Sequence, residues 1–236
     1  MYSFDTRIRY SELNKELKLP LVSLINLFQD SSTFHSESIG KGIDFMSERN
    51  HAWIIISWQI EVYDEVLPYE EVIINTWPTK FDAFFAYRDY TLTSKATGKV
   101  KAAATSMWTL LNTQTMHPSR ITPEFYEGYV IEEPFNIKFD KKKIMYLNEE
   151  YTDCNHVPVV GAHIDSNDHV NNGQYLSIAE EVLPTNFTYH RIRADYRKAA
   201  VLGDVIYPKI SVHEDKCVVL LKGNDDTIFT VIEFIK

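Results

Sequence analysis

The order of hydrophobic patterns constrains the fold of this chain most strongly, because the same order occurs twice. In each half a strand-like stretch precedes a segment with helical spacing, and a run of long strand-like segments follows. Some residue types also keep their spacing between the halves: Tyr63, Glu71 and Val72 match Tyr196, Asp204 and Val205, and Gln29-Asp30 matches Glu180-Glu181. A period near half the chain predicts two copies of one α+β unit.

The first half begins with a clean alternation that predicts a strand. The residues on one face of this strand are Tyr2, Phe4, Thr6, Ile8 and Tyr10. A helix with apolar positions 21, 24, 25, 27 and 28 is expected next, with Pro20 at its first position. Long strand-like segments follow at about 53–66, 71–94 (interrupted before residue 87) and 100–111, and Thr97-Gly98 reads as a hairpin turn.

The second half repeats this order. A short strand is expected to end at His163-Ile164-Asp165, and Pro184 is expected to stop the helix that follows. The residues on one face of that helix are Tyr175, Ile178, Ala179 and Val182. Strands are predicted at about 189–198, 204–212, 216–222 and 227–235. We therefore expect an N-terminal unit over 1–126, a charged, proline-containing linker over 127–148 and a C-terminal unit over 149–236.

A group of polar residues immediately precedes the second predicted helix. Asp165, Asn167 and His169 occupy alternate positions, so a carboxylate, a carboxamide and an imidazole can be directed at one point. Hydrolysis of an activated acyl group needs a base for the attacking water and donors for the anion that develops. The simpler interpretation is that these residues only form a loop and a helix cap, because Asp and Asn are common there.

Composition excludes several classes of function. The formal net charge of -9 argues against a general nucleic-acid binder. No apolar run approaches the roughly 20 residues of a membrane span, and we expect no signal peptide, hence a cytoplasmic protein. Cys154 and Cys217 are expected to be packed thiols in a reducing compartment. The chain has neither a Gly-rich phosphate loop nor a Gly-x-Ser-x-Gly elbow, so we expect no cofactor and no serine nucleophile.

The run from Asp165 to Tyr175 reads Asp-x-Asn-x-His-Val-Asn-Asn-x-x-Tyr and resembles the signature of acyl-acyl carrier protein (acyl-ACP) thioesterases of the plant and bacterial type. The resemblance extends to Trp53-Ile54-Ile55, to residues 106–112 and to Asp195-Tyr196-Arg197-Lys198, which is similar to a Glu-Tyr-Arg-Arg segment of the family. It implies a tandem hot-dog fold, in which each half is a long helix wrapped by an antiparallel sheet. It also implies that the N-terminal half shapes an acyl tunnel and the C-terminal half carries the chemistry.

One departure from the family changes the expected roles. Plant members have a glutamate after the Tyr-Arg-Arg segment, and this chain has Ala199 there, followed by Ala200. Single-domain hot-dog thioesterases that act on coenzyme A esters carry an aspartate ten residues before a tyrosine, and Asp165 and Tyr175 are similar to that pair. We therefore expect Asp165 to act as general base or as nucleophile, two roles that the residues do not separate.

The remaining site residues follow from the same resemblance. Asn167 and His169 are expected to donate hydrogen bonds or to position the water. Unpaired backbone N–H groups near Val170 to Asn172 are expected to point at the oxyanion. The residues expected to contact substrate are Val170, Asn171, Asn172 and Tyr175.

The implied partner is acyl carrier protein, which is acidic, so a protein of negative net charge needs a local basic patch to bind it. The first candidate patch contains Arg191, Arg193, Arg197 and Lys198, and the second contains Lys141, Lys142 and Lys143 next to Lys138. A solvated face is the simpler interpretation of the lysine run. We expect a monomer or a homodimer.

Several alternatives stay open at the level of sequence. His163, Asp165 and His169 also fit a zinc site, although we expect no metal. The residues Gln29, Asp30, Glu180 and Glu181 lie at helix positions that some hot dogs use catalytically, and a structural role is expected here. The same chemistry would suit an acyl-CoA thioesterase, and a non-catalytic acyl-binding hot dog is the alternative from another class.

Overall fold

The computed structural model describes residues 1–137, 140, 142–147 and 149–236. It divides into two compact units, residues 1–139 (unit 1) and 140–236 (unit 2). The division lies inside the stretch 127–148, for which the sequence predicts a linker. The domain limits at 126 and 149 stay predictions.

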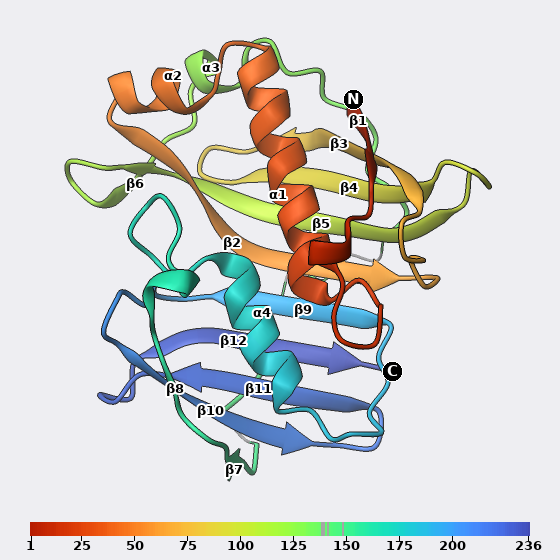
Figure 1. Ribbon diagram of the computed structural model, residues 1–236. Helices are drawn as coiled ribbons and strands as arrows, with labels where there is room; N and C mark the ends of the chain where they lie inside the picture. Colours follow the sequence, from red (N-terminus) through yellow and green to blue (C-terminus); the bar gives the residue numbers. More distant parts are fainter. Residues whose placement is uncertain (138–139, 141, 148) are drawn as a thin grey trace. The chain divides into compact units, whose positions relative to one another are not determined.

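Unit 1 is a long helix against an antiparallel sheet, with two short helices beside it (Figure 1). Its helices are α1 (Leu21–Ser38), α2 (Ile43–Glu48) and α3 (Pro123–Tyr126), and a 3-10 turn covers Tyr10–Glu12. Its strands are β1 (Tyr2–Arg7), β2 (His51–Val62), β3 (Glu71–Phe81), β4 (Ala86–Ser94), β5 (Val100–Asn112) and β6 (His117–Ser119). The strand order is β1-β3-β4-β5-β2, and β6 pairs with β5.

Unit 2 repeats this plan with a shorter helix (Figure 1). Its helix is α4 (Asn172–Glu181), preceded by a 3-10 turn over Gly161–His163. Its strands are β7 (Thr152–Asp153), β8 (Val157–Pro158), β9 (Arg191–Tyr196), β10 (Val205–Val212), β11 (Lys216–Lys222) and β12 (Ile228–Ile235). Their order is β7-β10-β11-β12-β9, with β8 also on β10. In this order β10, β11, β12 and β9 correspond to β3, β4, β5 and β2, which confirms the predicted α+β repeat and its hot-dog arrangement.

The apolar face of each helix packs on its own sheet. In unit 1, Phe28 of α1 lies 5.2 Å from the Tyr90 ring and 6.4 Å from the Trp58 ring, measured between centroids. In unit 2, Tyr175 and Ile178 lie on the buried side of α4, as predicted. Helical spacing in a helix and alternation in strands therefore produce the same two-layer core twice.

Four local expectations were wrong. Tyr10 leaves the strand and is exposed in a 3-10 turn, because β1 ends at Arg7. The segment 71–94 forms two antiparallel strands, β3 and β4, rather than one interrupted strand. His163-Ile164-Asp165 does not end a strand; a 3-10 turn ends at His163, and Ile164 only forms a bridge with Val170. Pro20 is the N-cap of α1, one position before its first helical residue.

The described residues of the connecting segment, the stretch 127–148, are hydrogen-bonded to a carboxylate in each unit. Within unit 1, the Asp89 carboxylate accepts a hydrogen bond from the Phe135 N–H at 2.7 Å. Within unit 2, the Asp195 carboxylate accepts one from the Ile144 N–H at 2.9 Å. Each end of the segment is thus held by a carboxylate of the unit on which it lies.

Candidate functional site

The polar motif forms one tight turn directly before α4. The Asp165 N–H donates to the His169 carbonyl at 2.8 Å, which closes the turn. The Asn167 N–H donates to Asp165 Oδ1 at 2.8 Å, an Asx turn in which the carboxylate shapes its own loop. Asp168 adopts a left-handed conformation (φ +60°), which Asp tolerates better than most residues. The turn therefore places Asp165, Asn167 and His169 on one short loop, and the convergence of their side chains on one point stays a prediction.

The three side chains differ in what they contact. Asp165 and His169 are half-buried, and Asn167 is exposed. Within the described part of the chain, no hydrogen bond joins one of these side chains to another. Among the described residues, no donor contacts Asp165 Oδ2, because the only bond to this carboxylate goes to Oδ1. One carboxylate oxygen is thus structural and the other is open to a water or a substrate.

Backbone hydrogen bonds hold the flanks of the turn. The Val170 N–H donates to the Ala200 carbonyl at 2.9 Å, and the Asn171 N–H donates to the His163 carbonyl at 2.9 Å. The expectation of unpaired N–H groups at Val170 and Asn171 was therefore wrong. Both donors complete the local fold, so an oxyanion would have to use other donors.

The first turn of α4 is capped by Asn171, whose side-chain oxygen accepts from the Gly173 N–H at 2.8 Å. Such a cap satisfies one of the orphan donors at a helix start. The positive end of the helix dipole remains directed at the turn, and it favours negative charge that develops there. Asn171 thus has a structural role, whatever it contributes to substrate binding.

Two tyrosines tie the segment after β9 to the start of α4. Tyr175, only 2% exposed, accepts a hydrogen bond at its hydroxyl from the Ala200 N–H at 2.7 Å. Burial raises the pKa of Tyr175 to about 12, so its hydroxyl keeps its proton. Tyr196 donates from its hydroxyl to the Asn172 carbonyl at 3.0 Å, and its ring meets that of Tyr175 edge-on at 5.9 Å. Burial also raises the pKa of Tyr196.

The position that differs from the family is therefore next to the site. Ala199 is exposed, and its neighbour Ala200 is fully buried, with its N–H on Tyr175 and its carbonyl on Val170. Sequence reasoning did not include Ala200 or the His163 carbonyl in the site. Both act through the backbone, so no residue type could have identified them.

A metal interpretation gains no support from geometry. Over the ranges that the structure describes, no group of three or more His, Cys, Asp or Glu side chains is placed to hold a metal ion. The Nδ1 atom of His163 lies 3.3 Å from the Val160 nitrogen and accepts a hydrogen bond from its N–H.

Among the described helices, none is both long and apolar enough to cross a membrane.

The basic residues proposed for carrier-protein binding differ in exposure and in whether they form ion pairs. The Arg193 side chain is 11% exposed and forms ion pairs with Glu233 at 3.2 Å and Asp140 at 3.3 Å. Arg197 and Lys198 are exposed. Lys138 and Lys141 lie outside the described residues, whereas Lys142 and Lys143 are described and exposed.

The acidic and amide residues within the helices occupy matching places. Gln29 and Asp30 are the ninth and tenth residues of α1, in its middle, and Glu180 and Glu181 are the ninth and tenth of α4, at its end. Glu180 accepts a short hydrogen bond from the Tyr189 hydroxyl. The first ten positions of α1 therefore match those of α4, and α1 continues beyond them toward its C-terminal end.

Comparisons with known proteins agree with the repeat. The family models described as the acyl-ACP thioesterase N-terminal and C-terminal domains match residues 1–129 and 147–231. An oleoyl-acyl carrier protein thioesterase of Arabidopsis thaliana chloroplasts is 25% identical over 84% of this chain and 60% of its own length. The chain therefore spans about 60% of the length of that curated relative.

Two solved structures share the fold over nearly the whole chain. The crystal structure of an acyl-ACP thioesterase from Bacteroides thetaiotaomicron has a TM-score of 0.89 at 21% identity, over 99% of this chain and 96% of the other. The 12:0-ACP thioesterase from Umbellularia californica has a TM-score of 0.84 at 18% identity, over 99% and 96%. These likenesses confirm the tandem hot-dog fold.

Proposed function

This chain belongs to the acyl-ACP thioesterase family, and on that premise we propose that it hydrolyses fatty acyl-ACP to free fatty acid and carrier protein, which ends chain elongation. The observation that supports this most is the turn before α4. Asp165, Asn167 and His169 lie on this turn before the N-terminus of α4, and among the described residues Asp165 Oδ2 accepts no hydrogen bond. Thioester hydrolysis needs this combination, namely a base, donors and a favourable field for an anion.

In the proposed mechanism Asp165 activates the attacking water through Oδ2 while Oδ1 holds the turn. Water adds to the thioester carbonyl carbon, and its proton passes to the carboxylate. The tetrahedral oxyanion accepts a hydrogen bond from the Asn167 amide and lies in the field of the α4 N-terminus. The C–S bond then breaks, and the carrier thiol leaves with the proton that Asp165 received.

A direct attack by Asp165 is the second route for the same residue. Its carboxylate would then form an anhydride with the acyl group, and water would hydrolyse that anhydride. Hydrolysis in 18O-labelled water under single-turnover conditions distinguishes the routes. Label in the Asp165 carboxylate supports an anhydride that water opens at the aspartyl carbonyl. Label confined to the fatty acid, with no aspartyl hydroxamate trapped by added hydroxylamine, supports the general base.

Because the family glutamate is absent, the proposed reaction depends on the residues of this turn. Ala199 has no titratable group, and Ala200 next to it is engaged only through its backbone. His169 is therefore proposed as the partner that positions the water or donates to the oxyanion. His169→Ala is expected to lower kcat, whereas loss of a purely structural histidine would lower the melting temperature instead.

The test is a hydrolysis screen with acyl-ACP substrates of different chain length, with Asp165→Asn as the negative control. Comparing kcat/KM for the same acyl chain on coenzyme A separates the two thioesterase hypotheses. Binding of acyl chains without turnover would support the non-catalytic alternative and overturn the proposal. Absence of cofactor, a cytoplasmic location and a monomeric or homodimeric state remain predictions.

A further inference from the structure

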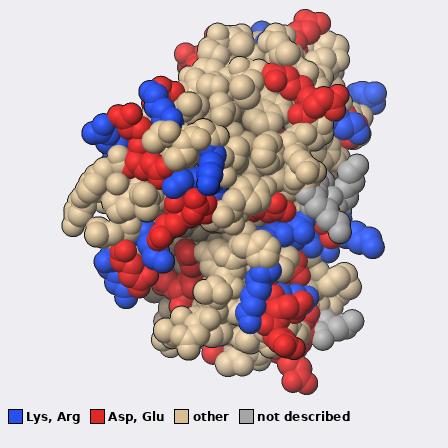
Figure 2. Space-filling view, turned by 90° about the vertical axis from the view of Figure 1, so that its right-hand side faces the viewer, with Lys and Arg blue, Asp and Glu red and all other residues tan. Residues whose placement is uncertain are grey.

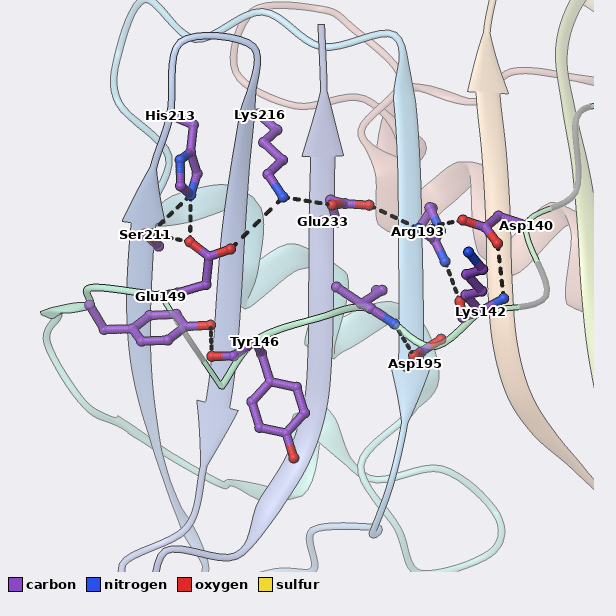
Figure 3. Close-up of polar contacts among 12 residues, drawn as sticks. Asp140, Lys142, Tyr146, Glu149, Arg193, Asp195, Ser211, His213, Lys216 and Glu233 are labelled. Carbon is purple, nitrogen blue, oxygen red and sulfur yellow. Dashed lines mark hydrogen bonds and ion pairs between the residues drawn. The ribbon is translucent and has the colours of Figure 1, made fainter.

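The connecting segment crosses the sheet of unit 2 on the side away from α4 (Figure 3). We call its described residues, 140, 142–147 and 149, the strap. Ile144 of the strap is 2% exposed and packs against Val218, Leu220 and Val231 of the sheet. Tyr146 packs beside it. The underside of the strap is thus part of the core of unit 2.

A row of ion pairs across the strands holds both ends of the strap (Figure 3). Asp140 pairs with Arg193 at 3.3 Å, and Arg193 pairs with Glu233 at 3.2 Å. Lys216 continues the row, at 3.3 Å from Glu233 and 3.9 Å from Glu149. Glu149 then meets His213 at 2.6 Å. Arg193 and Lys216 each lie between two carboxylates, so the row joins both ends of the strap to the strands.

The outer side of the strap presents apolar and basic side chains. Ile144 and Tyr146 point at the sheet, and between and beyond them Met145 is 69% and Leu147 is 76% exposed. Lys143 is also exposed and is two positions before Met145. Exposure alternates along these residues, since Ile144 is buried and Tyr146 is half-buried while Lys143, Met145 and Leu147 are exposed. Lys143, Met145 and Leu147 therefore form one outward row.

The two described lysines of the strap, Lys142 and Lys143, differ from many surface lysines of the chain in having no ion pair with another described residue. Many surface lysines of the chain have a carboxylate partner, as in the pairs Lys80–Asp82, Lys95–Asp5, Lys209–Asp153 and Lys222–Asp226. Basic and acidic side chains are accordingly interspersed on the face shown in Figure 2. Within the described residues, Lys142, Lys143 and Lys198 have no such ion pair. A local positive excess on a chain of net charge -9 suits an acidic partner.

A short path connects the strap with the proposed catalytic turn. The Arg197 guanidinium lies over the Tyr146 ring of the strap, 5.7 Å from its centroid. Three residues further along the chain, Ala200 donates to Tyr175 and accepts from Val170. Three extended residues span at most about 10 Å. The strap is therefore linked, through Arg197 and the segment 197–200, to the backbone that holds the turn.

We propose that the outer side of the strap is the docking surface for the acidic carrier protein. Lys143 and the exposed Lys142 beside it attract its carboxylates, and Met145 and Leu147 contact its apolar side chains. The ion-pair row contributes by holding the strap in its bound conformation before the partner arrives, which reduces the ordering cost of binding. This proposal rests on the proposed function, because that function identifies the partner.

The test measures binding separately from turnover. The dissociation constant of fluorescently labelled holo-ACP is measured for the wild type and for two double variants, Lys142→Glu/Lys143→Glu and Met145→Ser/Leu147→Ser. Matched controls in unit 1 are Lys99→Glu and Met116→Ser, which change an exposed lysine and an exposed methionine. Hydrolysis of acyl-ACP and of the same acyl chain on pantetheine is measured for each protein.

We expect each strap variant to weaken holo-ACP binding at least about tenfold and to raise KM for acyl-ACP, with acyl-pantetheine hydrolysis and both controls unchanged. The charge variant should also lose most of the salt dependence of binding. Equal binding by wild type and strap variants, or no binding by the wild type, would overturn the docking surface even if hydrolysis occurs. Binding that the strap variants lose, without hydrolysis of any thioester, would support docking and overturn the proposed function.

Discussion

The two units share one strand order, and they differ most at the start of the helix. α1 is 18 residues long, and its N-cap is Pro20, which makes no side-chain cap bond. α4 is 10 residues long, and its N-cap Asn171 binds the Gly173 N–H directly after the Asp165–His169 turn. The two units thus have the same topology, and only a few residues before one helix carry the proposed chemistry.

The units also differ in the partners of one arginine on each sheet, Arg88 and Arg193. In unit 1, buried Arg88 of β4 has neutral partners, His35 Nδ1 at 3.0 Å and Thr76 Oγ1 at 3.2 Å. Burial first, and Arg88 second, lower the pKa of His35 to about 4. In unit 2, Arg193, Glu233 and their neighbours neutralise one another beneath the strap. Because the pKa of His35 is lowered in the folded protein, its protonation as the pH falls below about 6.5 reduces stability.

The largest expected effect tests whether the chemistry belongs to the turn of unit 2. Asp165→Asn should lower kcat at least about 10³-fold, since general bases contribute about 10² to 10⁴ and Asn cannot accept the proton. Asp168→Asn is the matched control, because Asp168 lies on the same turn and Asn tolerates its left-handed backbone. Steady-state hydrolysis of acyl-ACP checks both; equal rates for the two variants would contradict the assignment.

Next in size is the loss of a donor from the same turn. Asn167→Ala should lower kcat about 10²-fold, or about 3 kcal/mol of barrier, with little change in KM. Its backbone N–H still binds Asp165 Oδ1, so the turn should keep its shape. Ser166→Ala should leave kcat unchanged. A variant that raises KM while kcat stays constant would indicate a binding role for Asn167 instead.

The third prediction concerns the carboxylate of unit 1 that holds the connecting segment. Asp89 is 1% exposed, and burial raises its pKa from 3.8 to about 6, against the effect of its bonds to Thr105 and Phe135. A raised folded pKa means that the protonated form favours folding, so stability is lost as the pH rises from about 4 through 6. Asp89→Asn should therefore stabilise the protein at pH 8 by at most about 3 kcal/mol.

Urea unfolding at pH 4 and at pH 8 checks this prediction. The stabilising effect of Asp89→Asn should be small at pH 4, where the wild-type carboxyl is protonated in the folded state. An equal effect at the two pH values would show that the change acts through packing and not through ionisation.

The smallest effect is expected from Asp195, the carboxylate of unit 2 that accepts a hydrogen bond from the connecting segment. Asp195 accepts from the Ile144 N–H and lies 3.5 Å from the Arg197 guanidinium. Asp195→Asn removes a charge that has a cationic neighbour, so it should destabilise the protein by about 1 kcal/mol at pH 8. The same urea measurement compares it with Asp89→Asn; the same sign for both variants would break the contrast between the units.

Segments of strand-forming residues between turn residues carried most of the fold information. Lys216–Lys222 forms a strand with the predicted limits, and the strand predicted over 100–111 forms Val100–Asn112, because each is a nearly continuous run of apolar and small residues. The turn of the site was identified by its residue types. Its unexpected features depend on long-range pairing, since Val170 N–H meets Ala200 and Arg193 lies opposite Glu233 in the sheet register. No local pattern in the sequence encodes which strand becomes the neighbour.

The double engagement of Ala200 has a consequence for how this site can change. Its N–H and its carbonyl secure the turn, and neither bond depends on a side chain at position 199. The shape of the site is therefore inherited independently of the chemical group that residue 199 supplies. A lineage can discard or regain a carboxylate at that exposed position in a single step, and an engineer can graft one there without rebuilding the loop.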